Sequence, residues 1–122
     1  MIHLICFVKA KQGMSREDFR THWADVHGPL VAEVVAGGGH TEFYAQYPRT
    51  DEDYDRPGAP DFDGVAVQSF QDMDDFRGFV SLPQVAEKLG PDGPKFMDGE
   101  KSVFILTDEP FVVVGTAQGQ AR

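Results

Sequence analysis

The chain has little cysteine and few basic residues, and each shortage excludes or disfavours a class of structure or function. Its single cysteine, Cys6, excludes a disulfide within the chain and lies in an apolar run, which favours a buried thiol in a reducing compartment. Eleven Lys and Arg residues stand against twenty Asp and Glu residues, for a net charge of −9 at pH 7, and the basic residues are scattered singly. Because phosphate contacts require a positively charged surface, nucleic-acid binding is disfavoured.

Long hydrophobic runs are also missing. The first apolar run, residues 2–8, follows no basic segment and precedes no small-residue cleavage site, so it predicts a strand rather than a signal peptide. No segment approaches the roughly 20 apolar residues of a membrane-spanning helix. We therefore expect a cytoplasmic protein that makes no membrane contact.

The absence of internal repeats indicates one domain. At 122 residues, 41% of them hydrophobic, the chain can bury a core without a disulfide or a metal. We place this domain at residues 1–114 and interpret residues 115–122, which have no apolar face, as a tail. Residues 48–63 are acidic and proline-rich, so they predict an exposed loop. Their run DEDYD lacks the glycine and the glutamate that a calcium loop needs, and no metal site is predicted.

Hydrophobic periodicity predicts alternating strands and helices. Ser15 and Asp18 are spaced as a helix N-cap and a third-position acid, and a stripe of apolar residues follows. Pro29 should break or kink this helix near Gly28, because proline lacks an amide and disfavours helix in the residue before it. The strands are expected at residues 2–8, 40–47, 64–70 and 102–107. The first helix is expected within residues 15–39, and the others from 73 through 79 and at 83–89, where Gly90 and Pro91 should end the last one.

The order β-α-β-β-α-β is that of a ferredoxin-like α+β fold, with a four-stranded antiparallel sheet against two helices. One layer of helices covers one face of the sheet. The predicted strands are apolar on both faces, as the alternation of Leu4 and Cys6 with Ile5 and Phe7 illustrates. Because a large exposed apolar face normally marks an interface, we expect a homodimer in which two sheets cover each other.

The segment HWADVHGPL, residues 22–30, holds the main candidate site. On a regular helical wheel His22 and His27 fall on opposite flanks of the apolar stripe, so they should not share one site, and their spacing of five does not suit zinc. His27 precedes the expected break and lies one turn after Trp23. It is therefore either an acid/base residue in a polar notch beside an apolar wall, or a boundary histidine that satisfies a loose carbonyl.

Other candidate binding residues lie on the second predicted strand. His40, Glu42 and Tyr44 share one side of that strand, which either faces solvent or lines a pocket. We assign Glu42 to solvent and retain His40 and Tyr44 as candidate substrate-binding residues. Trp23 is a core residue, a wall of the binding site, or both.

Three segments together are similar to the EthD domain family of dimeric α+β barrel proteins. They are SREDFRTHWADVHGPL, DFDGVAVQSFQDMDDFRGFV and KFMDGEKSVFILTDE, and the resemblance runs over roughly residues 1–114. It implies a ferredoxin-like protomer that dimerises through its sheet. Relatives include decarboxylases and dehydratases of aromatic polyketides, and the fold is shared with muconolactone-type isomerases. In several of these a histidine at the place of His27 is the candidate acid/base group.

Our leading hypothesis is an enzyme without a cofactor that binds a small apolar or aromatic molecule. His27 would move a proton in an isomerisation, dehydration or decarboxylation, and Trp23 would form an apolar wall. Two alternatives stay open. One is a non-catalytic ligand-binding accessory protein of an oxygenase system, which needs a pocket but no titrating group. The other is a monooxygenase, and thus an oxidoreductase, that uses no cofactor.

Overall fold

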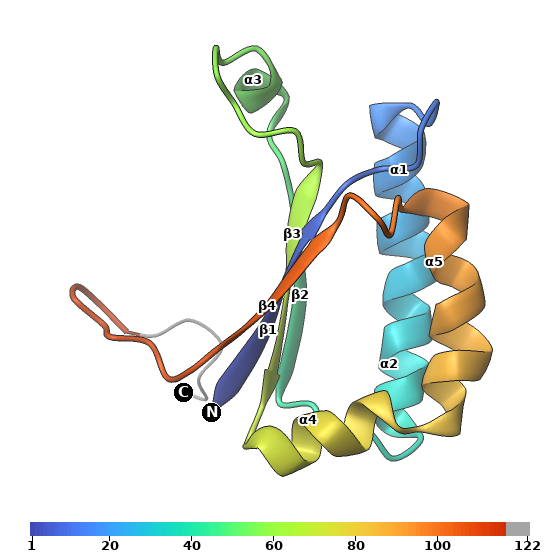
Figure 1. Ribbon diagram of the computed structural model, residues 1–122, viewed down its shortest axis with the longest axis vertical. Helices are drawn as coiled ribbons and strands as arrows, with labels where there is room; N and C mark the ends of the chain where they lie inside the picture. The colour runs from blue at the N-terminus through green and yellow to red at the C-terminus, as the bar shows by residue number, and fades with distance from the viewer. Residues whose placement is uncertain (117–122) are drawn as a thin grey trace.

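The computed structural model describes residues 1–116 and places four strands in one antiparallel sheet (Figure 1). The strands are β1 (Ile2–Val8), β2 (Phe43–Pro48), β3 (Gly64–Phe70) and β4 (Val103–Thr107), in the spatial order β2-β3-β1-β4. Together with the helices on one face, this arrangement confirms the predicted ferredoxin-like α+β fold. The second strand begins at residue 43, three residues later than expected.

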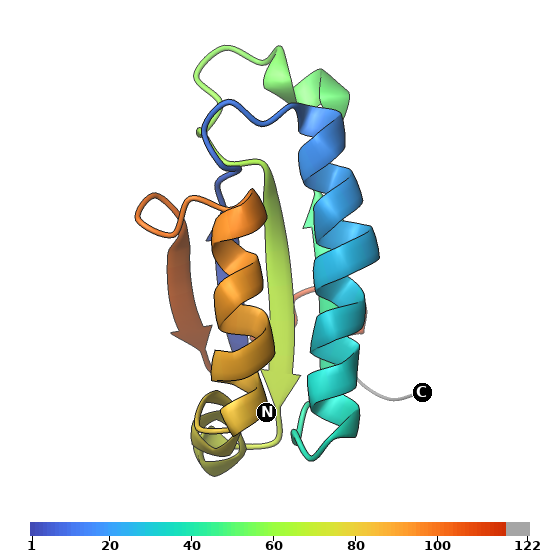
Figure 2. The ribbon, with the colours of Figure 1, turned by 90° about the vertical axis from the view of Figure 1, so that its right-hand side faces the viewer.

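The helices form one layer against the sheet, and two long helical segments run side by side in opposite directions (Figure 2). The first begins at Ser15, whose hydroxyl accepts a hydrogen bond from the amide of Asp18 at 3.0 Å, as the sequence predicted. The elements of the two segments are α1 (Arg16–His22), the π-helical turn η1 (Trp23–His27) and α2 (Gly28–Ala36), then the π-helical turn η2 (Val85–Leu89) and α5 (Gly90–Phe96). Helix α4 (Met73–Val80) lies across the end of the sheet.

The predicted break at Gly28 is wrong, because the helix continues through a π-helical turn. The amide of Gly28 donates to the carbonyl of Trp23, five residues back, instead of four. Pro29 has no amide, and its ring would clash with the carbonyl four residues earlier in a regular helix. The wider turn accommodates this proline, so the chain stays helical up to Ala36.

The predicted end of the last helix at Gly90 is also wrong, for the same reason. Here the amide of Gly90 donates to the carbonyl of Val85, and Pro91 occupies the first turn of α5. Each π-helical turn thus directly precedes a Gly-Pro pair. The second helical segment therefore reaches Phe96 and lies along the first.

The core fills the space between the helices and the inner face of the sheet. Phe19, Trp23 and Phe96 are buried against Cys6 and Val8 of β1. A second cluster near α4 contains Val34, Phe70 and Phe79. Both clusters stabilise the helix layer by removing aromatic surface from water.

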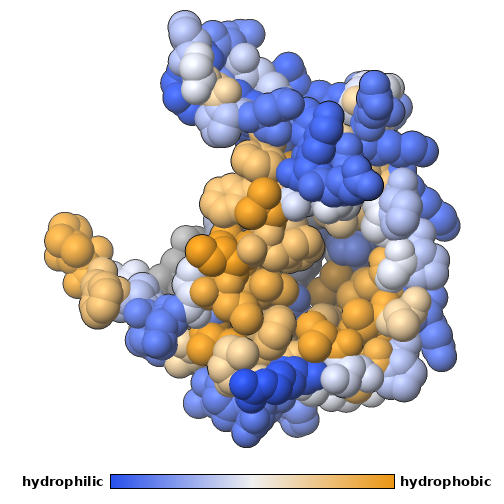
Figure 3. All heavy atoms as spheres, in the orientation of Figure 1, coloured by the Kyte–Doolittle hydropathy of each residue, from blue (hydrophilic) through white to orange (hydrophobic). Residues whose placement is uncertain are grey.

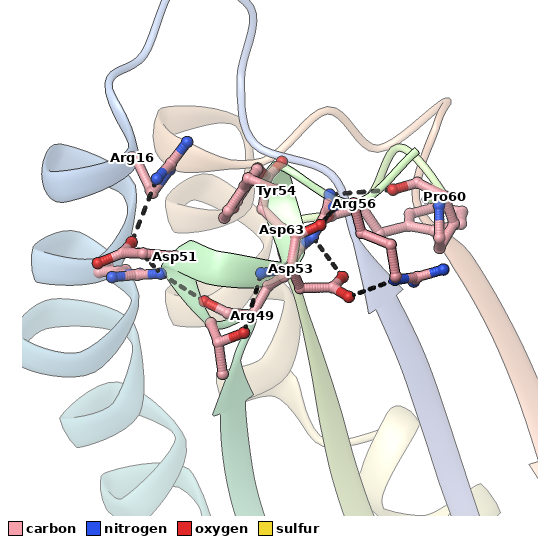
Figure 4. A network of polar contacts seen from close by, with 11 residues as sticks. Arg16, Arg49, Asp51, Asp53, Tyr54, Arg56, Pro60 and Asp63 are labelled. Atoms are coloured by element: carbon pink, nitrogen blue, oxygen red, sulfur yellow. Dashed lines mark hydrogen bonds and ion pairs between the residues drawn. The ribbon is translucent and has the colours of Figure 1, made fainter. Parts of the chain in front are cut away.

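The segment 48–63 is not only a loop, since it contains the short helix α3 (Asp51–Tyr54). The guanidinium groups of Arg16 and Arg49 lie over the Tyr54 ring, at 3.7 and 4.1 Å from its centre (Figure 4). The Tyr54 hydroxyl donates to Asp63 at 2.8 Å, and burial together with this carboxylate raises the pKa of Tyr54 to about 12. These contacts tie the segment to the start of α1, because Arg16 lies on that helix (Figure 4).

The outer face of the sheet is apolar, and no described helix covers it. Figure 3 shows hydrophobic side chains along this face and on a separate projection that follows β4. That projection contains Phe111, which is 98% exposed. Of the predicted tail, residues 117–122 lie outside the described residues. No helix among residues 1–116 is long and apolar enough to span a membrane.

A first prediction concerns Gly64, where β3 passes under the Trp23 ring. A Cβ atom at position 64 would lie 2.5 Å from Cζ3 of Trp23 and 3.0 Å from the carbonyl oxygen of Tyr47. Gly64→Ala should therefore lower the free energy of unfolding by about 2 kcal/mol, as overpacking of a core does. Urea unfolding of both proteins measures the difference.

The matched control is Gly78→Ala. A Cβ atom there would meet nothing within 4 Å, and Gly78 lies inside α4. Alanine is the better helix former, so this variant should unfold at a similar or slightly higher urea concentration. Equal stability of the two variants would contradict the close approach of Trp23 to β3.

Candidate active site

Two histidines of the first helical segment meet at one carboxylate of the second. Nε2 of His22 lies 2.8 Å from Oδ1 of Asp92, and Nδ1 of His27 lies 2.9 Å from Oδ2. The expectation that His22 and His27 point to opposite flanks is wrong. In a regular helix residues five apart differ by about 140°, whereas a π-helical turn brings them to the same side.

Asp92 is buried, with 4% of its side chain exposed. Burial alone would raise its pKa, but the hydrogen bonds from His22 and His27 and their charges together hold the pKa below its ordinary value. An ionised carboxylate only accepts hydrogen bonds, so we assign protons to Nδ1 of His27 and to Nε2 of His22. This tautomer leaves Nε2 of His27 able to accept a proton.

The ring of Phe96 fixes the two imidazoles from the other side. The His22 ring stacks on it with 5.1 Å between centres, and the His27 ring is tilted against it at 4.9 Å. Phe96 is itself buried beside Phe19. The imidazoles are thus held by both a carboxylate and an aromatic ring of α5.

A cavity of about 110 Å³ opens between the helix layer and the sheet. Three of the predicted site residues, Trp23, His27 and Tyr44, line it, whereas His40 is exposed and lies outside it. His40 precedes the observed start of β2, so it does not share the inward side of that strand. The remaining lining residues are mostly apolar: Leu4, Cys6, Val8, Val31, Ala66, Gln68, Leu89, Phe96, Met97 and Phe104.

Tyr44 brings a hydroxyl group to this cavity. Nε2 of Gln46 donates both to this hydroxyl, at 3.1 Å, and to the carbonyl of Trp23, at 2.9 Å. Burial raises the pKa of Tyr44, so the hydroxyl stays protonated at neutral pH and can donate to a ligand. Gln46 therefore links the π-helical turn to the hydroxyl of Tyr44.

The neighbouring thiol of Cys6 is poorly suited to act as a nucleophile. Burial raises the pKa of Cys6 to about 11, so the reactive thiolate is scarce at neutral pH. Among residues 1–116 no group of three or more His, Cys, Asp or Glu residues is arranged to hold a metal ion. His27 is the imidazole that lines this cavity.

Sequence reasoning missed Asp92 and Gln46. His27 directly precedes the first Gly-Pro pair, and Asp92 directly follows the second. This repeated Gly-Pro pattern is the feature of the sequence that could have linked the two residues. Gln46 carried no signal beyond its place on the same side of the strand as Tyr44.

This α+β fold thus carries an imidazole–carboxylate pair at the edge of an apolar cavity. Residues 11–100 match the EthD domain, so the chain belongs to the EthD domain family.

Two relatives of known name are dehydratases. The chain is 30% identical over 104 residues to the dehydratase ustZ of Ustilaginoidea virens, covering 79% of this chain and 74% of that protein. It is 28% identical over 104 residues to the conidial pigment biosynthesis dehydratase EthD of Metarhizium robertsii, covering 79% and 73%. A solved structure with the same fold is a dimeric ferredoxin-like protein of unknown function from Bacteroides fragilis, with a TM-score of 0.65, 10% identity and coverage of 88% and 95%.

A second prediction follows from the low pKa of Asp92. A carboxyl group whose pKa falls on folding stabilises the native state above its unfolded pKa, about 3.9, and this contribution disappears as the pH falls through the folded pKa. Asp92→Asn should lower the free energy of unfolding by about 2 kcal/mol at pH 6, and the loss should be smaller at pH 3, below the unfolded pKa. Urea unfolding at the two pH values tests this.

Asp74→Asn serves as the control, because Asp74 is 92% exposed and pairs with Arg77 on the surface. Exposed ion pairs contribute little, so its effect should stay below about 0.5 kcal/mol at both pH values. A loss for Asp92→Asn that is the same at pH 6 and pH 3 would show that the ionised carboxylate is not the stabilising species.

Proposed function

We propose that this EthD-family protein is a dehydratase that acts without a cofactor on a small, largely apolar molecule with an aromatic ring. The observation that carries the proposal is the His27–Asp92 contact, because it engages Nδ1 of a histidine that lines an apolar cavity and leaves Nε2 for a ligand. The two relatives named dehydratases support the reaction class. The apolar lining supports the substrate class.

In the proposed reaction Nε2 of His27 removes a proton from a carbon atom next to a carbonyl group of the substrate. The electron pair of that C–H bond forms a carbon–carbon double bond, and the neighbouring C–O bond breaks. The leaving hydroxyl takes the proton from His27 and departs as water. No oxidant or reductant is consumed, and the imidazole returns to its starting state.

Two neighbouring groups assist this transfer. The carboxylate of Asp92 stabilises the imidazolium that forms on His27 and holds the ring in one tautomer. The hydroxyl of Tyr44, oriented by Gln46, donates a hydrogen bond to the substrate carbonyl as negative charge develops there. Trp23 and Phe104 form apolar walls for the ring.

We also infer that the working form is a homodimer in which the outer faces of two sheets cover each other. The exposed apolar side chains of this face support the inference, since a face of this kind is rare on a monomer. The relative from Bacteroides fragilis is described as dimeric. The cavity lies on the opposite, helix-covered side of the sheet, so this dimer leaves it accessible.

The third prediction tests the role of His27. Hydroxylated aromatic ketones are screened by thermal shift, and each binder is incubated with the protein and analysed by mass spectrometry for loss of water. His27→Gln should lower turnover about 10²- to 10⁴-fold at a temperature where the variant is still folded, because general acid/base catalysis is worth that factor. The loss of one hydrogen bond to the buried Asp92 should also lower its melting temperature by several degrees. His40→Gln, at an exposed position outside the cavity, is the matched control and should retain its rate.

Two outcomes would contradict the proposal. Full activity of His27→Gln would exclude this residue as the acid/base group. Tight binding of aromatic ketones without any loss of water would instead favour the non-catalytic ligand-binding protein.

A further inference from the structure

One polar side chain on the sheet lines the cavity but has no part in the reaction proposed above. Gln68 lies on β3, an inner strand of the sheet, and 7% of it is exposed. Ala66 and Phe70, two residues to either side on the same face of the strand, are buried and apolar. An amide in such surroundings is unfavourable unless its hydrogen-bonding groups find partners.

The fold provides partners for only part of this amide. Nε2 of Gln68 donates to the hydroxyl oxygen of Thr41 at 2.9 Å. Among residues 1–116 no hydrogen bond reaches Oε1 of Gln68, although a glutamine oxygen can accept two. This oxygen is not sealed in the core, unlike the unpartnered Nε2 of His3 and Nε of Arg20. It is therefore an accessible acceptor at the cavity.

A donor lies beside this acceptor. Tyr44 is directly opposite Gln68 across the β2–β3 pair, and Leu4 is opposite it on β1. Side chains at directly opposite positions start from Cβ atoms about 5 Å apart. The Tyr44 hydroxyl accepts a hydrogen bond from Gln46, so its own proton is available to a ligand. The sheet thus offers a ligand one donor and one acceptor on neighbouring strands.

The lining of the cavity restricts the group that can meet this acceptor. The described residues around the cavity include no Asp or Glu, so a cationic amine would have no opposite charge there. A neutral hydroxyl group donates a hydrogen bond without that cost. Any ligand that fills the cavity removes water from Oε1 of Gln68, and it must offer a donor in return.

We propose that Gln68 is a specificity-determining residue whose Oε1 accepts a hydrogen bond from a hydroxyl group of the substrate. This inference rests on the proposed function and adds a second polar contact from the sheet to that of Tyr44. Two such contacts fix the rotation of the bound molecule, so they determine which carbon atom faces Nε2 of His27. A molecule in which this hydroxyl is absent or methylated leaves the acceptor buried without a donor and is rejected.

The fourth prediction concerns binding without turnover. The probes are ortho-, meta- and para-hydroxyacetophenone, the methoxy counterpart of each, and acetophenone itself. None of them can lose water, because the hydroxyl group is on the aromatic ring. In isothermal titration calorimetry at least one hydroxyl isomer should bind about tenfold or more tightly than both its methoxy counterpart and acetophenone, since a buried acceptor without a donor carries a cost of that size.

Three variants assign this preference to one atom. Gln68→Met keeps the length of the side chain without the amide, and the preference should fall to within about twofold. Gln68→Glu keeps the acceptor oxygens and should retain the preference, whereas a contact made by the amide N–H groups would be lost. Gln71→Met is the matched control, because Gln71 is exposed beyond the end of β3, and it should bind as the native protein does. Circular dichroism checks that each variant is folded.

The outcomes separate this inference from the proposed reaction. A native protein that binds the hydroxyl, methoxy and unsubstituted ketones equally would overturn the role of Gln68 whether or not any variant folds. A preference that persists in Gln68→Met, or that disappears in folded Gln68→Glu, would overturn it as well. A protein that shows the predicted preferences but never releases water would keep the role of Gln68 and lose only the dehydratase activity. Failure of every probe to bind at millimolar concentration would overturn both.

Discussion

The carboxylate of Asp92 joins the two long helical segments of this protein at a single buried point. It accepts one hydrogen bond from each of two histidines, and bonds to an ionised acceptor contribute about 1.5 to 3 kcal/mol each. A carboxylate left in this position without donors would be strongly unfavourable. The contact that holds His27 at the cavity therefore also sets the register of α5 against the first helical segment.

The two π-helical turns make that contact possible. Each widens the helix directly before a Gly-Pro pair, where proline removes one amide from the hydrogen-bond ladder. The first turn brings His22 and His27 to one side, and the second carries the chain past Pro91 so that Asp92 lies opposite them. In the first turn the carbonyl of Trp23 also accepts a hydrogen bond from the side chain of Gln46. The Gly-Pro pairs, which would interrupt two regular helices, thus help to organise the site.

The sequence predicted the fold well because strand patterns and helix caps are local signals. The strand at residues 64–70 and the cap at Ser15 were predicted as they occur. The site was predicted in part. Trp23 and Tyr44 were expected near His27 from their places on the helix and the strand, but Asp92 is 65 residues away in the chain and has no local link to His27. His22 and His27 were predicted on opposite flanks of the helix because a helical wheel assumes 3.6 residues per turn. The π-helical turn between them does not follow that spacing.

The tautomer of His27 tests the central claim most directly. A long-range ¹H–¹⁵N correlation spectrum of the histidine rings at pH 8 distinguishes the two ring nitrogens. The structure predicts a proton on Nδ1 and none on Nε2 for His27, the reverse for His22, and loss of both preferences in Asp92→Asn. A His27 ring that carries its proton on Nε2 in the native protein would contradict the account, because the nitrogen at the cavity would then have no capacity to accept a proton.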